Sequence, residues 1–267
     1  MSPLRCFVVL SLIVGLWSMM PPPSYAEGDV TKGAGNGSDR LYQSVTADRD
    51  VLHGHGEADH WEGSIAGKTY SERNHWLAGI LLLIIGYGEW RGARGDAPRW
   101  VLALAPAALM ASGAFLLIWS DHDAWPIGRM TLSETFLGGD LEILQHKAIG
   151  LMAVLVGAVE AGRRSRWLSS DRWAGLLPTY AIVGGLLLLV HEHGPHPSGH
   201  QIDQHHTIMA GLAVAAGLAK GLTLSNELFV RGDQLIPRMG LEMNVVGTRI
   251  WASLIVILGL LLVFYRE

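Results

Sequence analysis

Histidine is the residue type whose number and placement in this sequence point most clearly to chemistry. The 267-residue chain contains 12 histidines. They occur in the polar N-terminal region, at the starts of alternate apolar runs, and in the stretches that join the other ends of these runs. Imidazole is the commonest metal ligand in proteins and carries protons near neutral pH. This distribution predicts that the histidines gather at one level of the molecule and form a site there.

Three of these histidines, His75, His146 and His206, begin segments that align with one another. In the alignment a charged residue follows each histidine after 14 residues, and a small residue follows it after four. The pattern predicts three helical hairpins that arose by duplication. The charged residues are Glu89, Glu160 and Lys220, and the small residues are Gly79, Gly150 and Ala210.

Six long apolar runs dominate the sequence after residue 73. A helix of about 20 residues spans the hydrocarbon core of a bilayer, and runs rich in Gly and Ala without strict alternation favour helices over barrel strands. We therefore expect an all-α, polytopic membrane bundle of six transmembrane helices over residues 73–267. The runs are 75–90, 100–119, 144–162, 173–191, 206–225 and 246–265.

The first 72 residues have a different character. Residues 1–26 resemble a cleaved secretory signal peptide, with Arg5 near the start, an apolar stretch at 6–20, and Ser24-Tyr25-Ala26 before the cleavage point. The alternative is an uncleaved first transmembrane helix. Residues 27–72 contain histidine but few large apolar residues, so we expect a disordered arm.

The distribution of arginine between the loops predicts the orientation. Arginines are concentrated in the segments 91–99 and 163–172, whereas the segment 191–205 contains neither Lys nor Arg. Arg-rich loops stay in the cytoplasm. The arm and the histidine-rich loops are therefore expected on the periplasmic side of a bacterial inner membrane.

The predicted site is a metal centre on that periplasmic side. The only cysteine, Cys6, lies in the signal segment, so thiolate ligands are excluded from the mature chain. His206 and Met209 share a helix face, and imidazole with thioether suits copper, whereas imidazole alone also suits zinc or nickel. The simpler interpretation of each histidine is a polar residue at the water boundary. The candidate ligands are His75, His146, His191, His193, His205 and His206, assisted by His122, Asp121 and Glu192.

Two further features concern the ends of the predicted helices. The segment 131–144 predicts a short interfacial helix, broken at Gly138-Gly139, that either covers the site or only connects helices. Glu89 and Glu160 are expected near the inner boundary, where they either mark an exit for a cation or simply end their helices. Because no ionisable residue occupies the middle of a helix, the sequence favours metal binding over transport.

Parts of the sequence resemble integral-membrane copper-resistance proteins of the CopD type. The resemblance rests on His191-Glu192-His193-Gly194, on Gln204-His205-His206 and on the closing segment 260–267, and it covers residues 75–267. It implies copper handling at or across the inner membrane.

Three functions follow as hypotheses. The first is a non-enzymatic protein for copper binding and homeostasis, with the bilayer, the metal ion and a periplasmic metal-carrier protein as partners. The second is a b-type cytochrome that receives electrons from quinol and holds haem b between two histidines such as His75 and His146. The third is a non-catalytic membrane assembly factor. No phosphate loop, nucleophile elbow or basic face for nucleic acid occurs in the sequence.

Overall fold

Helices are the only regular secondary structure in the described part of the chain. The computed structural model describes residues 64–190, 199–230 and 237–266, and no strand occurs in these ranges. The predicted signal peptide and nearly all of the predicted arm lie outside them. The helices are α4 (Ile65–Gly92), α5 (Arg99–Leu102), α6 (Leu104–Trp119), α7 (Leu132–Leu137), α8 (Leu141–Arg164), η1 (Asp171–Gly175), α9 (Leu176–Leu189), α10 (Gly199–Val230) and α11 (Pro237–Val263).

Five helical segments are long and apolar enough to cross a membrane, which gives the chain the make-up of a polytopic membrane protein. The sixth predicted span, α4, is not among them. Its apolar run is short, because polar residues occupy positions 68–75 and Glu89 lies near its end. The five segments are Arg99–Trp119, Leu141–Arg164, Arg172–Leu189, His200–Leu224 and Asn244–Val263.

The helices begin earlier than the sequence suggested. His75, His146 and His206 were expected at helix starts, but α4, α8 and α10 begin 10, 5 and 7 residues before them. Residues 65–72, assigned to the arm, are therefore the first two turns of α4. Tertiary contacts stabilise these polar turns, because the side chains of Tyr70 and Asn74 both donate hydrogen bonds to the carbonyl of Trp119 on α6.

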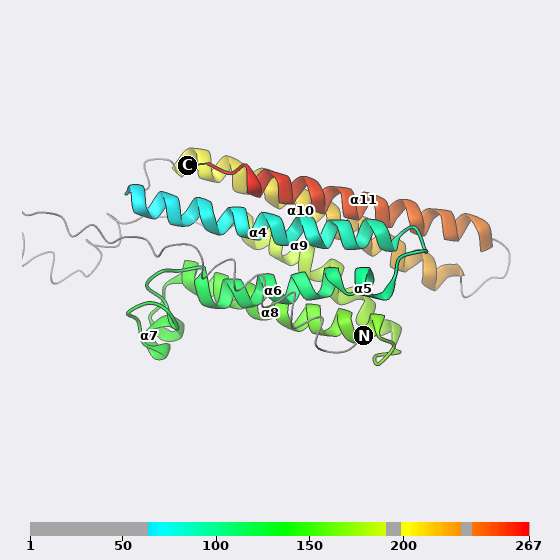
Figure 1. The fold of residues 1–267 in the computed structure, drawn as a ribbon, viewed down its shortest axis with the longest axis horizontal. Helices are drawn as coiled ribbons and strands as arrows, with labels where there is room; N and C mark the ends of the chain where they lie inside the picture. The colour runs from blue at the N-terminus through cyan, green and yellow to red at the C-terminus, as the bar shows by residue number, and fades with distance from the viewer. Residues whose placement is uncertain (1–63, 191–198, 231–236, 267) are drawn as a thin grey trace, which may run out of the picture.

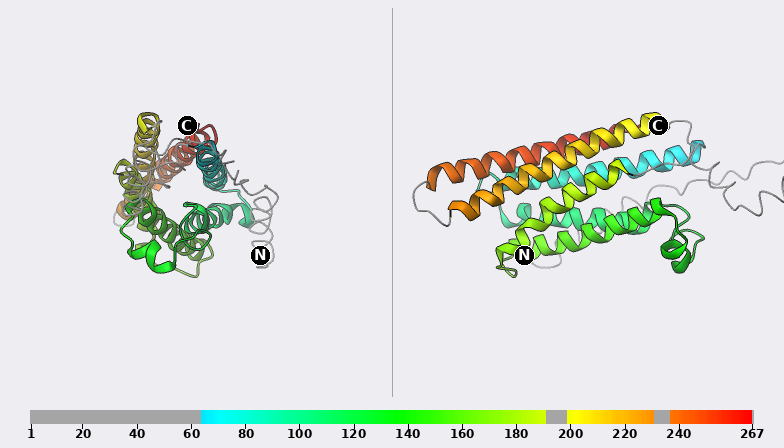
Figure 2. Two further views of the ribbon diagram at one scale, coloured as in Figure 1. Left: turned by 90° about the vertical axis from the view of Figure 1, so that its left-hand side faces the viewer. Right: turned by 180° about the vertical axis from the view of Figure 1, so that it is seen from behind.

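The six long helices form a closed ring. Helix α4 packs against α6, α6 against α8, α8 against α9, α9 against α10, α10 against α11, and α11 returns to α4. Their axes run roughly along the long dimension of the molecule (Figure 1). The end-on view in Figure 2 shows them arranged around a central axis. Side chains from all six can therefore meet inside the ring.

Three close contacts between small residues join neighbouring helices of this ring. A Cβ added to the glycine of each pair would lie 2.4–2.9 Å from a carbonyl oxygen of its partner. Residues without large side chains let membrane helices approach this closely. Each contact joins the first helix of one predicted hairpin to the second helix of the hairpin that precedes it around the ring. The third hairpin precedes the first in this order, because α11 packs against α4. The pairs are Gly79 with Gly259, Gly113 with Gly150, and Gly185 with Ala210.

The short helix predicted in the segment 131–144 is confirmed as α7. Thr131 forms a capping box with Glu134, and the helix ends at Gly138, followed by Gly139 in the left-handed conformation (φ 86°). Figure 1 shows α7 beside the helices, at the end where α8 begins. It contributes no residue to the cavity described below, so within the described chain it acts as a connector.

Candidate binding site

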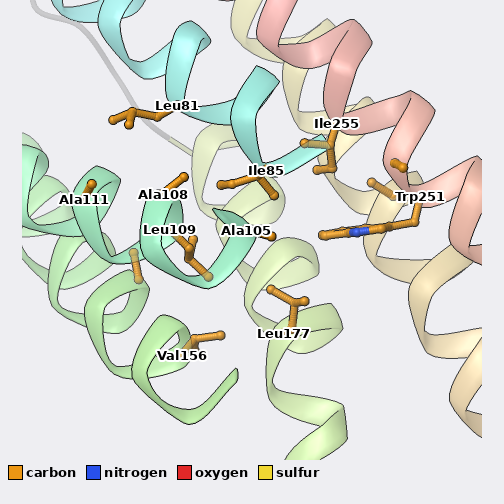
Figure 3. Close-up of a cluster of buried hydrophobic side chains, with 13 residues drawn as sticks. Leu81, Ile85, Ala105, Ala108, Leu109, Ala111, Val156, Leu177, Trp251 and Ile255 are labelled. Carbon is orange, nitrogen blue, oxygen red and sulfur yellow. The ribbon is translucent and has the colours of Figure 1, made fainter. Parts of the chain in front are cut away.

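The ring encloses a cavity of about 510 Å³ lined by residues from α4, α6, α8, α9, α10 and α11. One end of it carries His75, His146 and His206, and we call this the histidine end. The floor consists of apolar side chains from the buried core, among them Ile85, Leu109 and Trp251 (Figure 3). The cavity is therefore polar at one end and apolar at the other.

Apart from three tyrosines, the ionisable residues that line the cavity are acids and histidines. No Lys or Arg side chain is among the described lining residues. Carboxylates gathered in a low-dielectric concavity create a negative potential that attracts cations. The acids are Asp121, Asp123, Asp140 and Glu142, and the histidines are His75, His122, His146 and His206.

His146 on α8 is held in position by Asp121 at the end of α6. The Nδ1 atom of His146 donates to Oδ1 of Asp121 at 2.9 Å. The same carboxylate accepts from Ser120 and lies 3.6 Å from Nζ of Lys147, which also donates to the carbonyl of Leu117. Because Nδ1 carries the proton, the lone pair of the neutral ring is on Nε2. Asp121 therefore orients His146 and pairs with Lys147, so it is a partner of these side chains and not a separate ligand.

The surroundings of Asp121 favour its negatively charged form, and those of His122 favour its neutral form. Burial opposes ionisation of Asp121, but hydrogen bonds from His146 and Ser120 and the charge of Lys147 outweigh it, so the pKa of Asp121 lies below its ordinary value. Burial also lowers the pKa of His122, although Asp123, whose carboxylate is 3.0 Å from Nε2, partly offsets this. His122 is therefore neutral at neutral pH.

A second histidine group lies between α4, α10 and the end of the chain. The Nδ1 atom of His75 donates to the carbonyl of Ser71 at 2.9 Å, so its lone pair is also on Nε2. Its ring stacks on Tyr265, with centroids 4.0 Å apart, and lies 6.4 Å from the ring of His206. One turn further along α10, the buried side chain of Met209 also lines the cavity. The predicted shared face of His206 and Met209 is confirmed.

The structure brings together five of the nine predicted site residues. His75, His122, His146, His206 and Asp121 all line the cavity. They lie around its polar end, and no group of three or more His, Cys, Asp or Glu in the described ranges is close enough to hold a metal ion as it stands.

The other four predicted residues have different positions. His205 does not line the cavity. Its ring meets Tyr265 edge-on, and its buried Nδ1 atom has no hydrogen-bond partner in the described chain. His191, Glu192 and His193 lie outside the described residues.

Sequence reasoning missed the acidic part of the cavity and Tyr265. Glu142 lies one helical turn before His146, so this spacing on a predicted helix was a usable signal. Asp123 and Asp140 are far apart in the sequence, and nothing in the local pattern marks them as neighbours. Tyr265 was assigned only to a closing apolar segment, yet it is buried between two histidines.

The opposite end of the ring is closed by ion pairs, which we call the charge network. Glu89 accepts hydrogen bonds from Arg164 and, at 2.9 Å, from Lys220. Glu160 accepts from Arg164 at 2.8 Å and from Arg163 at 2.7 Å. The three charges that align in the sequence therefore meet in one buried cluster, although they come from α4, α8 and α10.

Comparisons with protein-family models, with curated proteins and with solved structures found no match. Function must therefore be argued from the residues themselves.

Proposed function

We propose that this protein binds copper, or a related divalent cation, in the cavity at the histidine end, and serves metal homeostasis at the bacterial inner membrane. The composition of the cavity lining carries the proposal. Its ionisable residues are four acids, four histidines and three tyrosines, with no Lys or Arg among the described ones. A cation is attracted by these four carboxylates, whereas an anion is repelled by them.

The arrangement of individual histidines supports metal ligation. His75 and His146 each use Nδ1 to donate to an oxygen, from Ser71 and Asp121 respectively. This partner fixes the ring and makes Nε2 the ligating nitrogen, as in most metal-bound histidines. Met209 adds a thioether beside His206, and this combination of ligands favours copper over zinc or nickel.

The remaining candidates complete the proposal. His191, His193 and Glu192 would join the site from the segment that follows α9, and His205 and His122 would lie beside it. A cation would bring the ligands closer together than they lie in the described structure, and a periplasmic metal-carrier protein is the expected donor. The protein is proposed to be non-enzymatic.

The same proposal includes six membrane spans arranged as three hairpin repeats after a cleaved signal peptide, with the histidine end in the periplasm. Support for the repeats comes from the three small-residue contacts and from the meeting of Glu89, Glu160 and Lys220. Support for the orientation comes from the Arg-rich segments 91–99 and 163–172 at the end with the charge network.

Binding is favoured over transport. Trp251 is 2% exposed and forms part of the floor of the cavity. Lys220 of the charge network is 6.0 Å from its ring centroid. A cation that left the cavity in this direction would have to cross an apolar layer and then meet Arg164 and Lys220.

Metal retention by the purified full-length protein tests the proposal. The protein is loaded with copper, zinc or nickel, desalted and analysed for metal. Wild type and the control variant His200→Ala, whose exposed ring does not line the cavity, should retain stoichiometric copper, and the double variant His146→Ala/His206→Ala should lose it. Absence of all three metals from wild type overturns the proposal, and full retention by the double variant overturns the location of the site.

A b-type cytochrome is the second candidate. The observation that favours it is the pair His75 and His206, whose rings are 6.4 Å apart at the top of an apolar cavity. The acidic lining opposes it, because the carboxylates of haem b would meet no described Lys or Arg there. A visible spectrum of the same purified sample separates the two candidates, since a Soret band favours the cytochrome.

A further inference from the structure

The cavity is much larger than a bound metal ion requires. Its volume is about 510 Å³, whereas one water molecule needs about 10–15 Å³ by the same measure. Pockets that bind small organic molecules have volumes of about 300–1,000 Å³. The ligands proposed for copper line only the histidine end, so the cavity continues beyond them toward the apolar floor.

The lining changes in character along the cavity. Acids and histidines surround one end, and the rest is lined by aliphatic and aromatic side chains such as Leu82, Phe115 and Ile255. A bare cation cannot use the apolar part, and a neutral apolar molecule cannot use the acidic part. The molecule that matches both parts has a positive charge and an apolar body.

Aromatic side chains add to this match. Phe115, Tyr180, Trp251 and Tyr265 all line the cavity. The face of an aromatic ring attracts a cation, and aromatic walls recognise quaternary ammonium groups in this way. Positive charge on a ligand is thus favoured by the walls as well as by the carboxylates.

We propose that the cavity binds lipophilic organic cations, meaning ammonium- or phosphonium-type ions with an aromatic or aliphatic body. This site goes beyond the proposed metal site, because it uses the volume between the histidines and Trp251. The two proposals can fail separately, since metal retention depends on the polar end alone.

Two ions of the same shape and opposite charge test the proposal directly. Tetraphenylphosphonium and tetraphenylborate are measured by equilibrium dialysis against the full-length protein in nanodiscs, with empty nanodiscs as the blank. We expect saturable binding of the phosphonium and none of the borate. Equal binding of both ions, or binding no greater than that of empty nanodiscs, overturns the proposal.

A space-filling variant locates the bound ion. Gly184 on α9 lines the cavity, and an added Cβ there would meet nothing within 4 Å. Gly184→Leu should therefore occupy the cavity and weaken phosphonium binding by at least about tenfold, which corresponds to about 1.4 kcal/mol. The matched control is Gly211→Leu, at a glycine that is equally open but does not line the cavity.

Copper retention provides the internal check. It should be unchanged in Gly184→Leu, which shows that the variant is folded and that the histidine end is intact. Ala181→Leu, at a second lining position of α9, serves as an independent space-filling variant. If copper is retained and both variants bind the phosphonium as wild type does, the organic-cation site does not lie in this cavity.

Discussion

Acidic side chains at the histidine end of the ring line a cavity, whereas each of the two acids at the opposite end is held between two basic side chains. Glu89 and Glu160 are each contacted by two cationic groups from the charge network. The cavity lining contains four acids and no described Lys or Arg. At the histidine end Asp121 and Asp123 each have one Lys or Arg partner, Lys147 at 3.6 Å and Arg129 at 3.7 Å, and neither of these partners lines the cavity.

This difference assigns separate roles to the two ends. A buried carboxylate paired with a guanidinium closes the ring, because separating the pair would leave an uncompensated buried charge. A carboxylate that lines a cavity contributes to the negative potential that an entering cation meets. Substitutions at the two ends should consequently affect different measurements, stability at one end and cation affinity at the other.

The largest expected effect comes from Arg164→Ala. Its side chain joins Glu89 of α4 to Glu160 of α8, and these carboxylates are 3% and 9% exposed. Loss of one partner of a buried ion pair costs about 3–5 kcal/mol, so the free energy of unfolding in mixed micelles should fall by that amount. Copper retention by the folded fraction should stay unchanged.

The control for this variant is Arg91→Ala. Arg91 has a single ion pair, at 3.8 Å, with Asp96, which is 71% exposed, so the expected loss is below about 1 kcal/mol. If the two variants unfold alike, the charge network does not stabilise the ring.

The close contacts between helices should show the next largest effect. In Gly113→Ala the new Cβ would lie 2.4 Å from the carbonyl oxygen of Gly150, so α6 and α8 must move apart. Overpacking of this kind costs about 1–3 kcal/mol. Because α6 and α8 carry Asp121 and His146 near their ends, both the unfolding free energy and the copper affinity should decrease.

Gly211→Ala is the matched control for the contact between α6 and α8. An added Cβ at Gly211 meets nothing within 4 Å, so neither stability nor affinity should decrease. A Gly113→Ala protein that is as stable as this control would show that the ring tolerates a wider separation of the two helices.

The third prediction concerns the histidine end alone. Asp121→Asn weakens the partner that orients His146, and loss of such a partner lowers metal affinity by about 10–100-fold. Stability should fall less than in Arg164→Ala, because Lys147 keeps its hydrogen bond to the carbonyl of Leu117. Competition titration with a copper chelator measures the affinity.

Asp203→Asn is the comparison for Asp121→Asn. Asp203 is exposed on α10 and does not line the cavity, so its removal should leave copper affinity unchanged. Equal effects of the two variants would mean that general surface charge, and not the orientation of His146, determines the affinity.

Several features of the fold could be predicted from local sequence. Long apolar runs gave the helices, Thr131 with Glu134 gave the capped start of α7, and Gly138-Gly139 gave its end. The common level of His75, His146 and His206 followed from their equal distances to the charges at the other helix ends. Helix starts were placed too late, because hydropathy alone does not register polar turns stabilised by contacts such as those of Tyr70.

The site was only partly predictable. Sequence alignment placed Glu89, Glu160 and Lys220 at equivalent positions, but it did not show that Arg164 joins them, because Glu89 and Lys220 are 131 residues apart. The acids of the cavity come from separate segments for the same reason. Asp121 was predicted as an assisting ligand, and its contact with His146 across two helices assigns it an orienting role.

The sequence by itself determined which segments are helical and at which end of them the histidines lie, because helix length and hydropathy are properties of consecutive residues. Only the tertiary structure decided which side chains face the inside of the ring. That depends on the order of the helices and on the rotation of each about its own axis. Close contacts such as Gly79 with Gly259 set this rotation, and with it the cavity at one end and the charge network at the other.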